Sequence, residues 1–393
     1  MVPDGWEETR LDKLSEKVTS GSRDWAKYYS DSGSKFIRMT NLVRGGIYLN
    51  LDDLRFVDVQ SDSSDGKRTS LQYGDILISI TAELGKIGWI DDSLGEAFIN
   101  QHTALVRINP NKAFSKYLAY LLASHSMNHK INRLNDAGAK AGLNLSTIRS
   151  IPVLLPPLPE QKKIAQILST WDQAITTTEQ LLANSQQQKK ALMQQLLTGK
   201  KRLLDDNRQV FSGEWEISKF HEILDIKKGK QLNRDTLSET GEYAVINGGV
   251  TPSGYTEASN WKANTVTISE GGNSCGYVDL QNSPFWLGGH CYAVDTKSFS
   301  VNFTYHLLKF HEHKIMRLRV GSGLPNIQKK DMYSLKLLYP NSSEEQQKIA
   351  AVLTAADNEI DTLKQKLDHL KQEKKALMQQ LLTGKRRVKV EVA

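Results

Sequence analysis

Histidine and cysteine side chains are the first candidates for chemistry in this sequence. His306, His311 and His313 follow one another closely, and Cys291 precedes them. Zinc sites in proteins use such ligands, usually at close and regular spacing. Cys291 and Cys275 form neither a close pair nor a Cys-x-x-Cys motif. We therefore expect the three histidines to be exposed on a helix and the chain to bind no metal.

The other candidate motifs do not predict catalysis. His102 and His290 each stand beside a predicted strand, which favours hydrogen-bonded structural histidines. "NSPF" at 282–285 is similar to the Asn-Pro-Pro-Phe motif of amino-methyltransferases, but its second residue is Ser283, and a turn before a strand explains it better. "SEGGNSCG" at 269–276 opens no helix, and no GxxxxGK[ST] phosphate loop occurs. We expect no catalytic residue and no cofactor bound by this chain.

Basic and amide side chains in predicted loops remain, and their chemistry suits DNA. Arg, Lys, Asn and Gln read base edges, while basic and hydroxyl groups hold phosphates. The formal charge of +7 and the pI near 9.1 agree with a polyanionic partner without requiring one. The predicted DNA-binding residues of the first half are Ser20, Ser22, Arg23, Lys27, Arg38, Asn41, Lys67, Arg68, Lys140 and Asn144. Those of the second half are Lys227, Lys228, Lys230, Gln231, Arg234, Asn247, Asn273, Arg319 and Ser322.

A long internal repeat must help to position these loops. Residues 189–202 and 374–387 are identical at thirteen of fourteen positions, and the 185-residue offset extends back to Glu160 and Glu345. Core-type positions recur at steps of four and three, as in the a/d seam of a coiled coil. The apolar seam comprises Ile164, Leu168, Trp171, Ile175, Leu182, Leu192 and Leu196, and then Ile349, Leu353, Ile360, Leu363, Leu367, Leu370, Leu377 and Leu381. The polar seam positions, which can set the register, are Thr178, Ser185 and Lys189.

Both copies have the end signals of a helix. Prolines at 156, 157 and 159 precede the first copy, and Pro340 with the capping candidates 342–345 precedes the second. Gly199 and Gly384 stand where a left-handed C-cap residue belongs. About 38 residues give a helix of about 57 Å. The nearest partner for so regular a seam is the other copy in the same chain.

Each helix also carries a wider apolar face near its C-terminal end. In the first copy, Leu192–Met193 and Leu196–Leu197 extend beyond one seam. Contact with the globular parts of this chain and docking of another protein are both open interpretations.

The segments between the helices share a faint skeleton. Aligning "GDILISI" with "NTVTISE" places Ser79 opposite Ser269 and His102 opposite His290. Short strands with a few helices predict mixed α/β domains. We expect an α+β fold with domains at 1–158 and 203–343. Two long helices, at 159–202 and 344–393 with a basic tail, would form an intramolecular antiparallel coiled coil with pseudo-twofold symmetry, which suits two half-sites on duplex DNA.

With these features the sequence resembles the specificity subunit of type I restriction–modification systems. The resemblance covers the whole chain and rests on "LPPLPEQKKIAQIL" at 155–168, "YPNSSEEQQKIAAVL" at 339–353 and the two "ALMQQLLTGK" endings. It implies two target-recognition domains and a DNA-reading subunit without catalytic chemistry. The target would be bipartite, with one half-site per domain. Because the domains have diverged, the half-sites would be unlike one another.

The resemblance also implies partners. Two modification subunits would methylate adenine with S-adenosylmethionine, and restriction subunits, with nuclease and translocase activity, would use ATP and Mg²⁺. The half-sites would lie roughly 10 base pairs apart, centre to centre.

The sequence has no apolar run of 18 residues and no secretory leader, so we expect a cytoplasmic protein outside the membrane. A self-contained DNA methyltransferase and a protein-binding coiled-coil scaffold are the alternatives.

Overall fold

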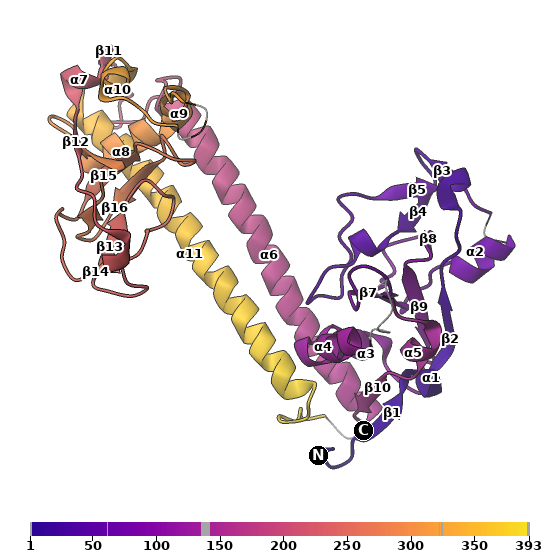
Figure 1. Ribbon diagram of the computed structural model, residues 1–393. Coiled ribbons are helices and arrows are strands. Elements are labelled where there is room, and N and C mark those ends of the chain that lie inside the picture. Colours follow the sequence, from indigo (N-terminus) through magenta and orange to yellow (C-terminus); the bar gives the residue numbers. More distant parts are fainter. Residues whose placement is uncertain (1, 61, 135–141, 322, 324, 391–393) are drawn as a thin grey trace. The chain divides into compact units, whose positions relative to one another are not determined.

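The computed structural model describes residues 2–60, 62–134, 142–321, 323 and 325–390. Two of the predicted DNA-binding residues, Lys140 and Ser322, lie outside this part of the chain. The chain divides into two compact units, unit 1 with Met1–Thr177 and Leu367–Ala393, and unit 2 with Thr178–Lys366. Each unit contains one globular domain and a part of each long helix (Figure 1). The domain limits expected from the sequence, 1–158 and 203–343, stay a prediction.

The described residues of the domain in unit 1 form three small sheets. A four-stranded antiparallel sheet has the order β2 (Ser15–Ser20), β9 (Thr103–Ile108), β6 (Ile76–Ser79), β7 (Ile87–Trp89). A second has the order β3 (Tyr29–Ser30), β5 (Arg55–Val57), β4 (Ser34–Ile37), β8 (Ala97–Ile99), with β4 and β8 parallel. The third pairs β1 (Glu7–Arg10) with β10 (Pro152–Leu155). Its helices are α1 (Leu11–Leu14), η1 (Trp25–Tyr28), η2 (Met39–Asn41), α2 (Ser64–Thr69), α3 (Ser115–Ala123), α4 (His125–Arg133) and α5 (Leu145–Arg149).

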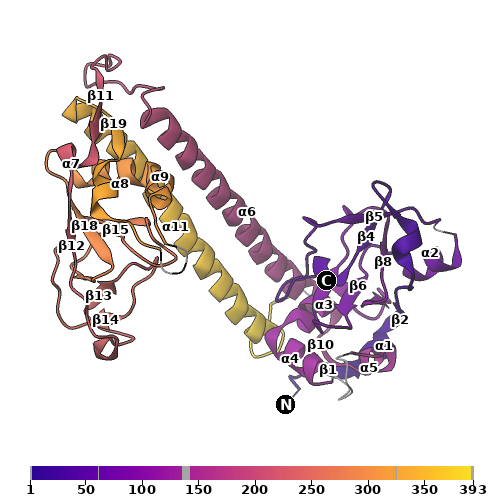
Figure 2. The same ribbon diagram turned by 45° about the horizontal axis from the view of Figure 1, so that its top comes forward.

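The domain of unit 2 repeats this arrangement (Figure 2). Its four-stranded sheet has the order β12 (Asp225–Lys228), β18 (Cys291–Asp295), β15 (Thr265–Ser269), β16 (Val278–Gln281). A three-stranded sheet has the order β14 (Tyr255–Thr256), β13 (Tyr243–Ile246), β17 (Trp286–Leu287), and β11 (Trp215–Lys219) pairs with β19 (Lys336–Pro340). Its helices are α7 (Phe220–Ile223), η3 (Arg234–Thr236), α8 (Val301–Phe310), α9 (Glu312–Arg317) and α10 (Lys329–Tyr333). As in unit 1, one strand pair, β13 with β17, is parallel.

The strand registers agree with the alignment that the sequence suggested. Ser79 pairs with Thr103 in unit 1, and Ser269 pairs with Cys291 in unit 2. His102 and His290 immediately precede those partners, so they occupy equivalent positions.

The two long helices are α6 (Leu158–Leu196) and α11 (Ser343–Leu381), each of 39 residues. The Ser342 hydroxyl accepts a hydrogen bond from the Glu345 backbone N–H at 3.3 Å, so it caps α11 as expected. After the helices, Gly199 and Gly384 have φ of 70° and 69°, a left-handed conformation that glycine adopts without a Cβ clash. Two long helices with glycine ends are therefore confirmed.

The two helices contact each other in antiparallel order inside each unit. In unit 1, Glu160 binds Arg387 at 2.8 Å. Asp172 follows Glu160 along α6, but its partner Lys374 precedes Arg387 in the chain. The contacts in unit 2 descend along α11 in the same way, joining Ser185 to Glu359, Lys189 to Asp357 and Arg202 to Glu345. The predicted fold class, with two mixed α/β domains and antiparallel long helices, is confirmed.

The seam side chains are buried or half-buried throughout both helices. Near the C-terminal ends the apolar residues enter the domain cores: Leu196 and Leu197 are 1% exposed in the core of unit 2, and Leu381 and Leu382 are 2% exposed in the core of unit 1. Of the two open interpretations, contact with the globular parts of the chain is the one observed for these leucines.

The expectation of exposed histidines on a helix was wrong for two of the three. His306 is 1% exposed and His311 is 4% exposed, whereas His313 is exposed. For His306 the reason is a contact distant in sequence: α8 packs against α11, where His306 Nε2 lies 2.9 Å from Thr354 Oγ1. Within the described residues, no cluster of three or more His, Cys, Asp or Glu side chains could hold a metal ion. No described helix is both long enough and apolar enough to span a bilayer.

Candidate nucleic-acid interface

A polar hollow of about 780 Å³ lies at one edge of the domain in unit 1. The end of β2, η1, α2 and the β8–β9 turn supply its walls. It brings together five of the predicted DNA-binding residues, namely Ser20, Ser22, Arg23, Lys27 and Arg68. The other lining residues are Gly21, Asp24, Asp65, Thr81, Gln101 and His102. We call this site the first-domain hollow.

Gly21 creates the hollow by a close approach of two backbone segments. A Cβ at Gly21 would lie 2.1 Å from the carbonyl carbon of Asn100, so only glycine fits there. The Gly21 N–H donates to Thr103 O at 3.3 Å. Arg68 secures the same turn by donating to the carbonyl oxygens of Ser20 and Gly21 at 3.2 and 3.3 Å. Arg68 therefore shapes the rim while it contributes a positive charge.

The wall of the hollow presents hydrogen-bonding groups. His102 Nδ1 lies 2.8 Å from Thr81 Oγ1, and its Nε2 lies 3.0 Å from Gln101 Nε2, in agreement with a hydrogen-bonded structural histidine. The Ser22 hydroxyl is buried, and it has no hydrogen-bond partner among the described residues. Arg23 and Lys27 are exposed at the rim. Exposed cationic donors at one hollow suit the oxygens of a phosphate.

A smaller hollow of about 480 Å³ adjoins strands β3, β4 and β5. Its lining includes the predicted residue Arg38 and also Tyr29 and Arg55, which the sequence reasoning missed. Arg38 Nη2 binds Asp53 Oδ2 at 2.7 Å, and this hydrogen bond and its positive charge lower the pKa of the Asp53 carboxyl. Tyr29 is 51% exposed, and its ring can stack on a base. The signal for Tyr29 was an aromatic pair directly after Lys27.

The second domain repeats the backbone arrangement around Gly21, which we call the shared frame. A Cβ at Gly229 would lie 2.3 Å from the carbonyl oxygens of Leu287 and Gly288. The matched backbone hydrogen bonds, first domain then second, are Gly21 N to Thr103 O and Gly229 N to Cys291 O, and Ile80 N to His102 O and Glu270 N to His290 O. Around the glycine, Lys228, Lys230 and Gln231 therefore stand where the first domain has Ser20, Ser22 and Arg23.

In the second domain, side chains at this edge bind other groups of the same domain. Lys228 Nζ binds Glu270 Oε1 at 2.7 Å, and the Tyr292 hydroxyl donates to the same oxygen at 2.7 Å. Asn247 Oδ1 accepts from the His290 backbone N–H at 3.0 Å. Lys230 is exposed. The structure thus brings Lys228, Lys230, Gln231 and Asn247 to one edge.

The other predicted residues lie elsewhere in the domains. Two of the asparagines have local structural contacts: Asn41 is buried and donates to Asn50 O at 2.9 Å, and Asn144 caps α5 through the Thr147 N–H. Lys227 lies 3.4 Å from Asp295. The remaining ones are exposed, namely Lys67, Arg234, Asn273 and Arg319. DNA contact by any of these residues remains a prediction.

The groups that could have supported catalysis are placed without a reactive arrangement. Burial raises the pKa of the Cys275 thiol to about 11 and that of the Cys291 thiol to about 12, so neither is a thiolate at neutral pH. The "NSPF" stretch precedes β17, with residues 282–284 exposed and Phe285 buried, and "SEGGNSCG" connects β15 to β16.

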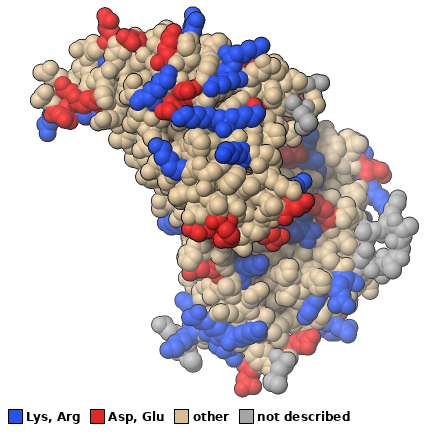
Figure 3. All heavy atoms as spheres, turned by 60° about the vertical axis from the view of Figure 1, so that its left-hand side comes forward, with Lys and Arg blue, Asp and Glu red and all other residues tan. Residues whose placement is uncertain are grey.

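On one face of the molecule, charge alone marks no interface. On the face drawn in Figure 3, basic side chains in blue and acidic ones in red are interspersed between uncharged areas. The first-domain hollow is identified instead by the types of its lining residues, with three basic side chains and two acidic ones.

Comparisons with known proteins agree with this arrangement. The family model described as the type I restriction modification DNA specificity domain matches residues 3–184 and 212–372. A putative type I specificity subunit of Mycoplasma genitalium is 32% identical over 38% of this chain and 39% of that protein. The chain thus spans about two-fifths of that relative. The putative type I restriction enzyme MjaX specificity subunit of Methanocaldococcus jannaschii is 26% identical over 99% of this chain and 95% of that protein.

The fold recurs in solved structures. The crystal structure of a type I restriction-modification S subunit from M. genitalium matches 97% of this chain and 96% of that chain, with a TM-score of 0.71 and 18% identity. A structure from work on complex assembly of the type I R-M system matches with a TM-score of 0.56 and 18% identity. Since the family model covers both domains and most of both helices, this chain belongs to the family of type I restriction–modification DNA specificity subunits.

Proposed function

We propose that each globular domain reads one half of a bipartite DNA target. The observation that carries this proposal is the shared frame: the glycine, the sheet order and the backbone hydrogen bonds recur, while the side chains at the same edge differ. Two related readers with different contact residues suit two different half-sites. The family model covers both domains, which supports the same division of labour.

In the first domain, the hollow supports a contact with the DNA backbone. Arg23 and Lys27 supply exposed cations at its rim. Such contacts hold a protein in register on DNA while other side chains read bases. The neighbouring Tyr29, Arg38 and Arg55 supply an aromatic face and guanidinium groups for that second task.

The chain acts within a larger complex in this proposal. Two modification subunits that use S-adenosylmethionine would methylate adenine, and restriction subunits that use ATP and Mg²⁺ would cleave DNA. Family membership supports such partners, as does the similarity to a structure solved in work on complex assembly of the type I R-M system. Catalysis would then belong to the partners, and the buried, protonated thiols of this chain agree with that assignment.

The test uses the chain co-expressed with a modification subunit from the same host. Methylome sequencing defines the target, and binding to it is then measured against salt concentration. Arg23→Ala with Lys27→Ala should weaken binding and reduce the slope of log affinity against log salt by about 1 to 2. Lys130→Ala with Arg133→Ala, an exposed pair on α4 with the same change in charge, serves as the control and should leave the slope unchanged. A complex that neither co-purifies nor binds DNA would refute the proposed function.

A further inference from the structure

Two Lys–Asp ion pairs lie along the contact of the long helices, between the Glu160–Arg387 and Arg202–Glu345 pairs near the helix ends. In unit 1, Lys374 binds Asp172, with side chains 9% and 16% exposed. In unit 2, Lys189 binds Asp357, with side chains 14% and 27% exposed. Both lysines occupy seam positions and are repeat copies of one another, as are both aspartates.

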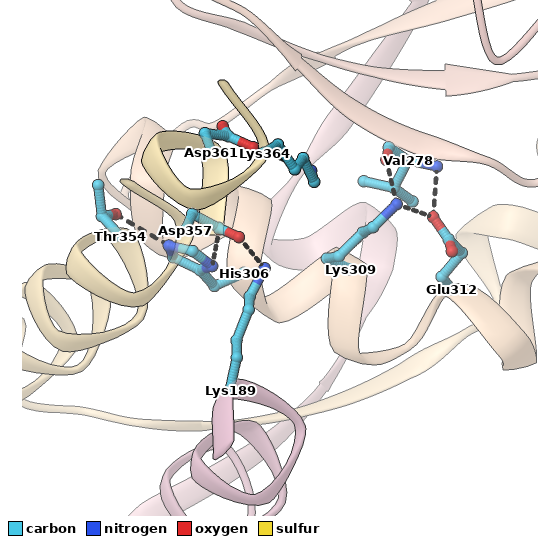
Figure 4. Close-up of polar contacts among 9 residues, drawn as sticks. All are labelled: Lys189, Val278, His306, Lys309, Glu312, Thr354, Asp357, Asp361 and Lys364. Atoms are coloured by element: carbon cyan, nitrogen blue, oxygen red, sulfur yellow. Dashed lines mark hydrogen bonds and ion pairs between the residues drawn. The ribbon is translucent and has the colours of Figure 1, made fainter. Parts of the chain in front are cut away.

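A side chain of the adjoining domain faces each pair. In unit 1 the Tyr120 hydroxyl donates to Asp172 Oδ2 at 2.5 Å. In unit 2, His306 Nδ1 lies 3.8 Å from Asp357 Oδ2, as Figure 4 shows beside Lys189. Each ion pair thus lies where both long helices meet a domain helix, α3 in unit 1 and α8 in unit 2.

Apolar residues alone do not select one alignment of these helices. A heptad seam that slides by seven residues still places leucine and isoleucine against similar side chains. Because the two helices are copies, a parallel alignment would also match every seam residue with its own counterpart. That parallel alignment would place Lys189 against Lys374 and Asp172 against Asp357, so like charges would be buried together. Only the observed antiparallel alignment buries each lysine with an aspartate.

We propose that Asp172–Lys374 and Asp357–Lys189 are the residues that set the register and direction of α6 against α11. A slip in either direction separates both pairs and leaves buried charges without partners, which is strongly unfavourable. The apolar seam supplies the adhesion, and the two pairs select one alignment. A consequence for DNA recognition, that the register fixes the spacing of the two half-sites, rests on the proposed function.

The test separates register from stability. Ser185 and Glu359, whose side chains lie 3.1 Å apart across the helices in unit 2, are replaced by cysteine in the full chain, and oxidative cross-linking reports the register. The neutral variant carries Lys189→Met, Asp357→Asn, Lys374→Met and Asp172→Asn. It should fold and melt within a few degrees of the parent, while cross-linking falls at least twofold. A further variant exchanges the charges of the unit 2 pair, Lys189→Asp with Asp357→Lys, and keeps Asp172 and Lys374 in unit 1. It should show most of the cross-linking that the neutral variant loses.

Two other ion pairs shown in Figure 4 are matched controls. Lys309–Glu312, at 2.6 Å and about as buried, holds α8 to Val278 within the domain. Lys309→Met with Glu312→Gln should lower stability without changing the cross-linking. Asp361–Lys364 is exposed on α11, and Asp361→Asn with Lys364→Met should change neither.

The outcomes divide clearly. Full cross-linking in the neutral variant, or its failure to fold, would overturn the proposal, because the pairs would then be dispensable for register or needed for folding itself. If cross-linking falls but DNA binding still requires the same spacing of the half-sites, the two ion pairs set the register. Only the idea that the register fixes this spacing would then be refuted. Loss of DNA binding by the parent complex would instead count against the proposed function.

Discussion

The two domains share a frame, but they differ at its rim. Around the matched glycines, the first domain presents Ser20, Ser22 and Arg23 at an open hollow. The second domain presents Lys228, Lys230 and Gln231, and Lys228 is neutralised by Glu270. The helices, in contrast, are nearly identical over long stretches. The chain thus varies the side chains that can contact a ligand and retains the residues that hold the backbone.

The helix ends show a second difference between the units. In unit 1, buried Glu160 binds Arg387 and also accepts from Trp6 Nε1 at 3.1 Å. In unit 2, Glu345 binds Arg202 at 2.6 Å. The indole N–H of Trp215 has no hydrogen-bond partner among the described residues. The carboxylate therefore binds an arginine in each unit, but it accepts a hydrogen bond from an indole only in unit 1.

The largest expected effect comes from removing these carboxylates. Arg202 is 19% exposed and Arg387 is 44% exposed, so the unpaired cation is less hydrated in unit 2. We expect Glu345→Ala to cost about 3 kcal/mol and Glu160→Ala about 2 kcal/mol. Hydrogen exchange in the first turns of α11 and α6 reports each unit separately.

A second substitution distinguishes the two causes. Trp6→Phe in the Glu160→Ala chain should recover about 1 kcal/mol, because it removes the indole that lost its acceptor. Trp215→Phe should change the stability by the same amount with and without Glu345→Ala, because the Trp215 indole does not donate to Glu345. Equal recovery in both would show that the indole contact does not distinguish the units.

The next effect depends on pH. Burial, and then the charge of Lys189, lower the pKa of His306 from 6.5 to about 3. Around this side chain, α6 contributes Lys189, and α11 contributes Asp357 and Thr354. Because the pKa in the folded chain lies below its unfolded value, the stabilisation is complete above pH 6.5 and is lost as the pH falls toward 3. Between pH 6.5 and 5 the loss is about 2 kcal/mol.

Substitutions can remove this pH dependence or transfer it. His306→Gln should remove about 2 kcal/mol from the loss of unit 2 stability over that range, as followed by hydrogen exchange in α8, and leave the part that His311 contributes. Tyr120→His should introduce a similar dependence into unit 1. His311, whose burial lowers its pKa to about 4, is present in both the parent and the His306 variant, so it cancels in the comparison. An unchanged slope in His306→Gln would refute the assignment to His306.

The sequence predicted the parts of the molecule that local patterns determine. The helices followed from the seam and the glycine ends, and the equivalence of His102 and His290 followed from matched strands. The burial of His306 did not follow, because its partner Thr354 is 48 residues away in the chain. The hollow depends on the approach of Gly21 to Asn100, a tertiary contact without a local signal. Arg55 reaches its hollow only through strand pairing with Phe36.

The smallest expected effect concerns the rims of the two domains. Lys228 already binds Glu270, so Lys228→Ala should change the salt dependence of DNA binding little, whereas Lys230→Ala should reduce the slope by about 1. Arg23→Ala should act similarly in the first domain. If each domain reads one half-site, base changes in one half of the target should lose their effect with Arg55→Ala and those in the other half with Lys230→Ala, by about 1 kcal/mol or more wherever the side chain contacts a base. Uniform losses across both halves would make these residues phosphate contacts only, and the differing rims would then adjust affinity rather than the choice of sequence.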